Sequence, residues 1–198
     1  KDNRTRSEKF QLKTAIVREN GALSVEKTAL TEAGAGHMGS FWEKYQMIRE
    51  QNPRIRFLEP EFKDGGKTVC FRYLEGETLA DALADRIHMG QIPYEELERV
   101  MALVFPEDFS VDSGHFSIKE QTGGPFAPSQ GFTEVFGPVP EGLEELGRLT
   151  AAPNVDGLFE NLMISDGHVY GIDYEWVFDM EIPARFLHYR NLLYFYRR

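Results

Sequence analysis

Asp156, Asn161 and Asp173 are three oxygen-bearing side chains in one short segment of the chain. An Asp with an Asn five positions later, as at 156 and 161, can supply both groups that the catalytic loop of a phosphotransferase needs. The Asp would accept the proton of a substrate hydroxyl, the Asn would bind a magnesium ion, and the later Asp would hold that ion against nucleotide phosphates. Each residue alone is more typical of a loop turn. The combination predicts a phosphoryl-transfer site with Asp156 as the base and with Asn161 and Asp173 as metal ligands.

A β-hairpin is expected to position these side chains. Two short apolar runs, 162–165 and 168–172, are separated by an Asp-Gly dipeptide at 166–167, which favours positive φ and a tight turn. A two-residue turn then places Asn161 opposite the residue before Asp173. We therefore expect both side chains at the open end of the hairpin.

The segment resembles the catalytic and metal-binding loops of the kinase-like superfamily, in the variant of aminoglycoside and choline kinases where Ile-Asp-Tyr-Glu replaces Asp-Phe-Gly. The resemblance implies ATP and Mg²⁺ as cofactors. Asn154 stands where protein kinases usually have a His, and Glu175 stands where they have a Gly. These two departures argue against a protein substrate.

A first pair of antiparallel strands is predicted upstream, at 10–17 and 22–28, because an Asn-Gly dipeptide at 20–21 lies between two strand-like runs. The second strand carries Lys27, where the resemblance implies the lysine that binds the α- and β-phosphates of the nucleotide. A lone strand lysine is ordinarily a solvated residue at a sheet edge. Both interpretations of Lys27 stay open at this point.

The segment 34–39 matches Gly-x-Gly-x-x-Gly, and Glu59 and Glu61 follow about 20 residues later, as in a dinucleotide-binding fingerprint. That motif must directly follow a buried parallel strand, whereas the preceding residues 28–33 are polar and poor in β-branched aliphatics. A dinucleotide-binding oxidoreductase is therefore the less favoured alternative.

A helix over 31–50 is the preferred interpretation of this region. One face of it would carry Ala33, His37, Phe41, Tyr45 and Ile48. The three glycines weaken its first turns, and the run 40–43 resembles a capping box that could start the helix late. In the kinase resemblance a Glu of this helix pairs with the lysine, but Glu43 lies off the apolar face and His37 lies on it. The partner of Lys27 is left open.

Two further strands, 54–58 and 68–73, are expected to complete a small antiparallel sheet with the first hairpin. The chain then enters a segment that resembles the kinase hinge, which implies Tyr73 and Glu75 as nucleotide-binding residues. A helix is predicted from 79 onward.

The rest of the chain contains two more predicted helices. One covers 95–104, with Leu97, Met101 and Val104 on its inner face, and the other covers 186–195, which is rich in aromatic residues and expected to be buried. Between them, 106–140 is rich in Gly, Pro, Ser and Phe and shows little periodicity, which is typical of a binding loop or lid.

Composition restricts the class of protein. The 198 residues are 41% apolar and 13% aromatic, enough for a real core, and a net charge of −10 with a pI near 5.0 disfavours nucleic acid as a partner. Cys70 is expected to be a buried thiol in a reducing compartment, and the five histidines show no zinc-ligand spacing. No apolar stretch is long enough for a membrane span. We expect a cytoplasmic protein whose charged segment 1–9 frays, apart from Arg4 and Arg6, which could have a specific role.

These observations predict an α+β protein with a two-lobed, shortened protein-kinase-like fold. The expected N-lobe, 1–74, has an antiparallel sheet and one helix, the expected C-lobe, 75–198, carries the catalytic hairpin, and ATP would lie between them. The outline of the chain also resembles kinase-like domains that occur with bacterial glycosyltransferases and methyltransferases of surface-polysaccharide assembly.

The predicted function is ATP- and Mg²⁺-dependent phosphoryl transfer to a small-molecule or glycan hydroxyl. The second resemblance implies fusion to, or association with, a glycosyltransferase or methyltransferase. No recognisable Gly-rich loop precedes the first strand. A non-catalytic, kinase-like regulatory module of a larger enzyme is therefore the main alternative.

Overall fold

The computed structural model describes residues 2–90, 93–119, 126–139 and 147–198, and all elements named below lie in these ranges. It shows an α+β protein with several small, mostly antiparallel sheets. The predicted α+β class is confirmed. No helix in the described ranges is both long enough and apolar enough to cross a membrane.

Four antiparallel strands form the first sheet. In spatial order they are β1 (Leu12–Glu19), β2 (Ala22–Ala29), β5 (Thr68–Arg72) and β4 (Glu61–Lys63). Asn20 and Gly21 join β1 to β2 with φ angles of 50° and 86°, the positive values that a two-residue hairpin turn requires. The first predicted hairpin is confirmed, although it begins later than expected, because Glu8–Phe10 form the short 3-10 helix η1.

Four strands also form the second sheet. In spatial order they are β3 (Ile55–Phe57), β11 (His168–Gly171), β10 (Leu162–Ser165) and β6 (Glu77–Thr78). The prediction that the strand at 54–58 belongs to the first sheet is wrong, because β3 pairs in parallel with β11. Gly171 explains this pairing, since a Cβ atom there would collide with the ring of Phe57. The missing side chain lets β3 approach the hairpin.

Gly76 brings the start of β6 against β10. Its φ angle of 151° is one that L side chains rarely adopt, and a Cβ atom there would collide with the carbonyl oxygen of Ile164. Ile164 pairs with Glu77 in the ladder between the two strands. Glycine therefore lets the chain pass close to the hairpin directly after Tyr73 and Glu75.

The single helix predicted over 31–50 is two helices, α1 (Glu32–Gly39) and α2 (Phe41–Ile48). The Thr31 side chain caps α1 by accepting a hydrogen bond from the backbone nitrogen of Gly34 at 3.1 Å. Ser40 lies at the junction, and its hydroxyl donates to the carbonyl oxygen of His37 instead of capping α2. The predicted capping box is therefore wrong. The low helix propensity of the glycines is the physical reason for the break.

The buried face of these helices differs from the predicted one in its first half. It consists of Gly34, Met38, Phe41 and Ile48. Phe41 and Ile48 were expected there, but Ala33 is exposed. Because Gly34 has no side chain, α1 lies close to the end of β2, and a Cβ atom at Gly34 would come within 3.2 Å of the Ala29 Cβ.

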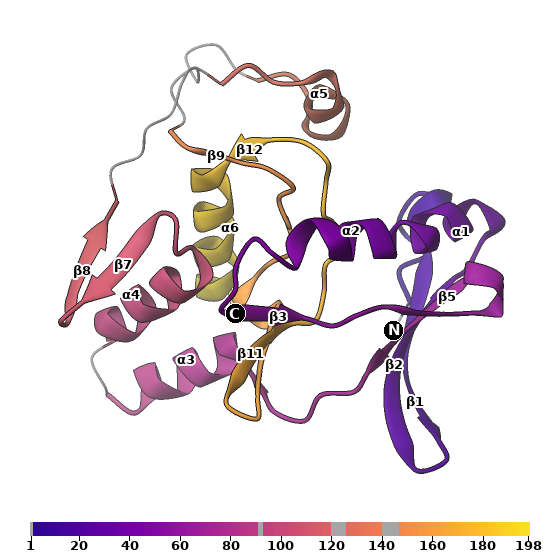
Figure 1. Ribbon diagram of the computed structural model, residues 1–198, viewed down its shortest axis with the longest axis horizontal. Helices are drawn as coiled ribbons and strands as arrows, with labels where there is room; N and C mark the ends of the chain where they lie inside the picture. Colours follow the sequence, from indigo (N-terminus) through magenta and orange to yellow (C-terminus); the bar gives the residue numbers. More distant parts are fainter. Residues whose placement is uncertain (1, 91–92, 120–125, 140–146) are drawn as a thin grey trace.

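Three helices lie on the far side of the molecule from the first sheet (Figure 1). They are α3 (Leu79–His88), α4 (Pro93–Val104) and α6 (Ala184–Tyr196), and the short strands β9 (Leu149–Thr150) and β12 (Ile182–Pro183) pair beside them. All three helices were predicted. The expectation that α6 is buried is wrong for one of its faces. Phe186, Tyr189 and Tyr196 are exposed on it, whereas Leu187 is buried.

The stretch 106–140, predicted to be irregular, contains regular structure within its described part. β7 (Phe109–Asp112) and β8 (His115–Ile118) form a hairpin, and α5 (Gln130–Phe136) follows. The turn uses Ser113 and Gly114 at φ angles of 50° and 84°. Stacking of Phe109 on Phe116, with ring centroids 5.5 Å apart, stabilises the hairpin. Residues 120–125 and 140 lie outside the described part.

A buried ion cluster ties this hairpin to α6. The Asp108 side chain, which is fully buried, accepts two hydrogen bonds of 2.7 Å from the Arg148 guanidinium. The His188 ring lies 3.0 Å from Oδ2, one of the two oxygens that accept from Arg148. Although burial acts to raise the pKa of Asp108, the hydrogen bonds from Arg148 and His188 lower it strongly. The carboxylate is therefore held in its charged form.

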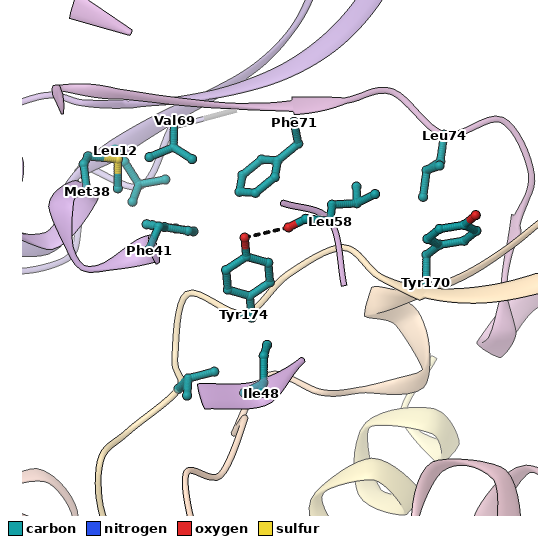
Figure 2. Packing of buried hydrophobic residues seen from close by; sticks show 11 residues of the cluster. Leu12, Met38, Phe41, Ile48, Leu58, Val69, Phe71, Leu74, Tyr170 and Tyr174 are labelled. Atoms are coloured by element: carbon teal, nitrogen blue, oxygen red, sulfur yellow. Dashed lines mark hydrogen bonds between the residues drawn. The ribbon is translucent and has the colours of Figure 1, made fainter. Parts of the chain in front are cut away.

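Tyr174 is the centre of the core below the first sheet, as Figure 2 shows. Its hydroxyl donates to the carbonyl oxygen of Leu58 at 2.8 Å, and its ring lies 5.7 Å from that of Phe41 and 5.8 Å from that of Phe71. The core thus joins the segment after the β10–β11 hairpin to α2 and β5. Cys70 on β5 is buried, as predicted.

Substitution of Gly76 by Ala should destabilise the protein much more than the same change at Gly21. Both glycines have positive φ, but a Cβ atom at Gly21 would meet open space. We expect Gly21→Ala to cost about 1–2 kcal/mol, and Gly76→Ala about 3 kcal/mol or more because backbone must also move. Urea unfolding of both variants measures the difference. Equal losses would show that β6 can shift away from the hairpin at little cost.

Candidate functional site

The hairpin that was predicted to carry the site is confirmed. Ser165 pairs with His168 across the turn, and Asp166 and Gly167 have φ angles of 49° and 73°. At the open end, the backbone nitrogen of Ile172 donates to the carbonyl oxygen of the predicted metal ligand Asn161 at 3.0 Å. The two-residue turn therefore gives the predicted register, in which Asn161 lies opposite Ile172, the residue before Asp173.

Asn154 joins the three predicted catalytic and metal-binding residues. Its side-chain amide donates to the carbonyl oxygen of Asp173 at 3.0 Å, and its side-chain oxygen accepts from the backbone nitrogen of Asp156 at 3.2 Å. The Asn161 amide donates to the carbonyl oxygen of Asp156 at 2.9 Å. Asp156, Asn161 and Asp173 thus belong to one hydrogen-bonded unit, with the nitrogen of the Asn161 amide directed at the backbone.

Asp156 is paired with Arg190 of α6, and the guanidinium lies 3.0 Å from its carboxylate. The same guanidinium donates to the carbonyl oxygen of Val155 at 2.8 Å, which fixes its orientation. Burial raises the pKa of Asp156, the hydrogen bond from Arg190 opposes this, and the nearby charge of Asp173 adds to the increase. Arg190 was not predicted as a site residue, because no local spacing links it to Asp156.

Lys27 extends from β2 to the hairpin and bonds to Asp173 over 2.8 Å. It is only 5% exposed, and β2 lies inside the first sheet with β1 and β5 on its two sides. The alternative that Lys27 is a solvated edge residue is therefore wrong. This ion pair joins two residues that are far apart in the chain: Lys27, the predicted phosphate-binding lysine, and Asp173, a predicted metal ligand.

Glu175 lies next to this pair and is 3% exposed. One carboxylate oxygen lies 2.6 Å from the Arg6 guanidinium and 3.2 Å from the His37 ring, and the other lies 3.7 Å from the Lys27 ammonium. Lys44 donates to the backbone carbonyl oxygen of Glu175 at 2.6 Å. Burial acts to raise the pKa of Glu175, but the hydrogen bond with His37 and the charges of Lys27 and Arg6 together lower it.

These contacts answer the question of which residue pairs with Lys27. Its partners are the carboxylates of Asp173 and Glu175, both in the segment after the hairpin. The helices α1 and α2 supply His37 and Lys44 to this cluster, while Glu43 of α2 is exposed. The sequence showed His37 on the relevant side, but it carried no signal for the role of Glu175.

An apolar cavity of about 240 Å³ lies between residues of the first sheet and residues of the hairpin segment. Its walls include Val25, Leu58, Phe71, Tyr73, Leu74, Met163 and Ile172. An adjoining polar cavity of about 430 Å³ is lined by Tyr73 and Glu75 and also by Arg72 and Ser165. The two predicted nucleotide-binding residues of the hinge-like segment therefore border space that is open to a ligand.

The glycine-rich segment 34–39 lies inside α1, as predicted. The strand before it, β2, runs antiparallel to both β1 and β5. A dinucleotide-binding fingerprint needs a parallel strand at this place, so the structural context of that fingerprint is not present here.

Comparison with known proteins adds no family assignment. No protein-family model, no curated protein and no solved structure matches the chain. Arguments about function therefore depend on the geometry of the described residues.

The side-chain oxygens of Asp173 and Asn161 are suited to a small, hard cation whose other ligands are phosphate oxygens and water. Within the described ranges, no group of three or more His, Cys, Asp or Glu side chains could enclose a metal ion. Asp173 and Asn161 could contribute one carboxylate and one amide oxygen. Magnesium binds in this way, through one or two carboxylates together with phosphate oxygens and water.

Lys44 should make the stability of the protein depend on pH in the alkaline range. Burial lowers its pKa from 10.5 to about 8, with Lys27 acting in the same direction and Glu175 opposing. Between these two pH values the unfolded chain binds more protons than the folded one, so the free energy of unfolding should rise with pH. We expect Lys44 to contribute an increase of about 2 kcal/mol between pH 8 and pH 10.

Urea unfolding at several pH values can isolate this contribution. The increase should be absent from Lys44→Met and retained in Lys13→Met, which changes an exposed lysine of β1. Identical pH profiles for wild type and Lys44→Met would show that Lys44 is protonated in the folded protein throughout.

Proposed function

We propose that the protein is an ATP- and Mg²⁺-dependent phosphotransferase with a shortened, two-lobed kinase-like fold, which phosphorylates a hydroxyl of a small molecule or a glycan. The ion pair between Lys27 and Asp173, next to an apolar cavity, is the observation that carries this proposal. The first sheet with α1 and α2 would form the N-lobe, and the remainder the C-lobe.

The arrangement of the cavity and the charged residues supports a nucleotide between these parts. Val25 lines the cavity and lies two residues before Lys27 on β2, so both side chains are on the same face of the strand. On the opposite wall, Ile172 directly precedes Asp173. A planar base in the apolar cavity would therefore have its phosphates next to Lys27 and Asp173, with Tyr73 and Glu75 at the outer side.

Asp156 would act on the acceptor hydroxyl. Its partial burial raises its pKa, which makes it a better proton acceptor than an exposed Asp. Arg190 holds the carboxylate in one orientation, and Asn154 fixes the backbone of its loop. Asn161 and Asp173 would hold the magnesium ion, which would neutralise charge on the transferred phosphate.

The charge of the chain and its second resemblance indicate the class of acceptor. The net charge of −10 disfavours polyanionic acceptors such as nucleic acids. The resemblance to domains of bacterial surface-polysaccharide assembly favours a glycan hydroxyl and an associated or fused glycosyltransferase or methyltransferase. The glycan acceptor and the associated or fused enzyme are therefore included in the proposal.

The second candidate is a non-catalytic module that binds nucleotide and regulates a larger enzyme. The conformation of the segment before β1 favours it. Residues Glu8–Phe10 form η1 and pack against α1, with the Phe10 ring 5.0 Å from that of His37. This described segment is therefore not a glycine-rich hairpin over the cavity.

A ligand screen separates the candidates. Thermal unfolding should be measured with ATP, ADP and NAD(H), each with and without Mg²⁺. Stabilisation that needs both ATP and Mg²⁺ supports the phosphotransferase, and stabilisation without metal supports the module. Stabilisation by NAD(H) alone would favour the dinucleotide-binding alternative.

Asp156→Asn and Asp173→Asn should have different effects. Asp156 would contact the acceptor and not the nucleotide, so Asp156→Asn should keep ATP affinity and lower turnover by about 10²–10⁴-fold. Asp173→Asn removes a charged metal ligand and should weaken Mg²⁺-dependent ATP binding itself. Calorimetry at saturating Mg²⁺ and an ATP turnover assay measure the two effects.

Asp85→Asn is the matched control, because Asp85 is exposed on α3. Wild type that binds ATP without turning it over would favour the regulatory module. Wild type that binds no nucleotide would leave the hairpin as a structural element only.

A further inference from the structure

We propose that Glu175 is the positioning residue that keeps Lys27 in place for the nucleotide phosphates when Asp173 turns to its magnesium ion. This inference rests on the proposed function and adds a residue to it. The contacts of Glu175, Asp173 and Lys27 support it.

The two carboxylate oxygens of Glu175 have different partners. Oε1 lies 2.6 Å from Arg6 and 3.2 Å from His37. Oε2 faces the Lys27 ammonium at 3.7 Å, within ion-pair distance but beyond a short hydrogen bond. Glu175 therefore has one oxygen directed at Lys27 that could close on it with a small movement.

Asp173 faces two demands in the proposed reaction. Its Oδ1 atom accepts hydrogen bonds from Lys27 at 2.8 Å and from the backbone nitrogen of Glu175 at 3.2 Å. Binding to a magnesium ion would commit the charge of this carboxylate to the ion, and the ion would repel the ammonium group. Lys27 would then keep Glu175 as its carboxylate partner beside the phosphates, because taking a partner from a buried charge is costly.

Glu175 is held from three sides, so it can serve as that partner with only a small movement. Arg6 reaches it from the segment before η1, and Arg6 also lies over the Trp176 ring, 5.2 Å from its centre. His37 holds it from α1, and Lys44 of α2 binds its backbone carbonyl oxygen. Because these supports come from three separate elements, the carboxylate has a fixed position next to β2.

The helices themselves offer Lys27 no carboxylate. The acidic residues within α1 and α2 are Glu32 and Glu43, and both are exposed. Glu32 pairs with Lys67. The segment of Asp173 and Glu175 thus supplies both carboxylate partners of Lys27, and α1 supplies His37, whose ring contacts Glu175.

The test uses four proteins: wild type, Lys27→Met, Glu175→Gln and the double variant. In Glu175→Gln the amide could still accept from Arg6 but would lack the charge opposite Lys27. Since Lys27 would contact phosphates and not the base, Glu175→Gln should weaken Mg²⁺-ATP binding about 10-fold and leave adenosine binding within about twofold. In the Lys27→Met background, Glu175→Gln should have almost no further effect on ATP affinity.

Two further variants serve as control and safeguard. Glu43→Gln removes an exposed helix carboxylate and should leave both affinities unchanged. Glu175→Asp keeps the charge but shortens the side chain, so it should fold if Glu175→Gln does not, and should weaken ATP more than adenosine. Equal weakening of ATP and adenosine, or an undiminished effect of Glu175→Gln without Lys27, would overturn the proposal.

Thermal unfolding without nucleotide distinguishes this inference from the proposed function. The melting temperature of the double variant should fall by clearly less than the sum of the two single losses, because each single change takes one partner from the same buried charge pair. If wild type binds no nucleotide, the proposed function fails while this coupling is still measured. Additive losses would show that Glu175 does not hold Lys27, whatever the protein binds.

Discussion

The buried charges around Glu175 impose the strongest constraint on this structure. Lys27 and Glu175 are 5% and 3% exposed, and buried charges are tolerated only when each has a partner of opposite sign in good geometry. Satisfying them requires β2, the two helices α1 and α2, the segment before η1 and the segment after the β10–β11 hairpin to meet at one point. The removal of any one of these elements would take a partner from the cluster in a region with low dielectric constant. The ion cluster therefore fixes the distance between the first sheet and the hairpin.

Close backbone contacts and one aromatic side chain hold the rest of the protein to that cluster. Gly171 and Gly76 let β3 and β6 lie against the hairpin, because a side chain at either position would collide with its neighbour. Tyr174, between Asp173 and Glu175 in the chain, points into the core and packs on Phe41 of α2. Alternation along this short segment places one residue in the core and its two neighbours in the ion cluster. Packing and electrostatics thus reinforce each other at the same residues.

The geometry explains why a nucleotide is the proposed ligand. Val25 and Ile172 line an apolar cavity, and in the chain they lie two residues before Lys27 and one residue before Asp173, which pair with each other. A ligand with an apolar planar end and an anionic end matches such a gradient of polarity. Asp156 lies on the same hydrogen-bonded loop but is paired with Arg190, so its charge is separate from the phosphate side. Under the proposed function, this arrangement would divide the site into a nucleotide part and an acceptor part, as phosphoryl transfer needs.

The sequence by itself determined the local structure and much of the candidate site. Asn-Gly and Asp-Gly turns, helical periodicity and the spacing of Asp156 and Asn161 depend on residues that are close in the chain, so both hairpins, the later helices and the unit around Asp173 could be predicted. The partner strand of β3, the break at Ser40, the cap at Thr31 and the roles of Glu175 and Arg190 could not be. Arg6 lies 169 residues from Glu175 in the chain, and Asp108 lies 40 residues from Arg148. Only the tertiary structure decides such pairs, because many carboxylates in the sequence could pair with the same cation. The pair that forms depends on which backbone segments pack closely enough to bury both charges.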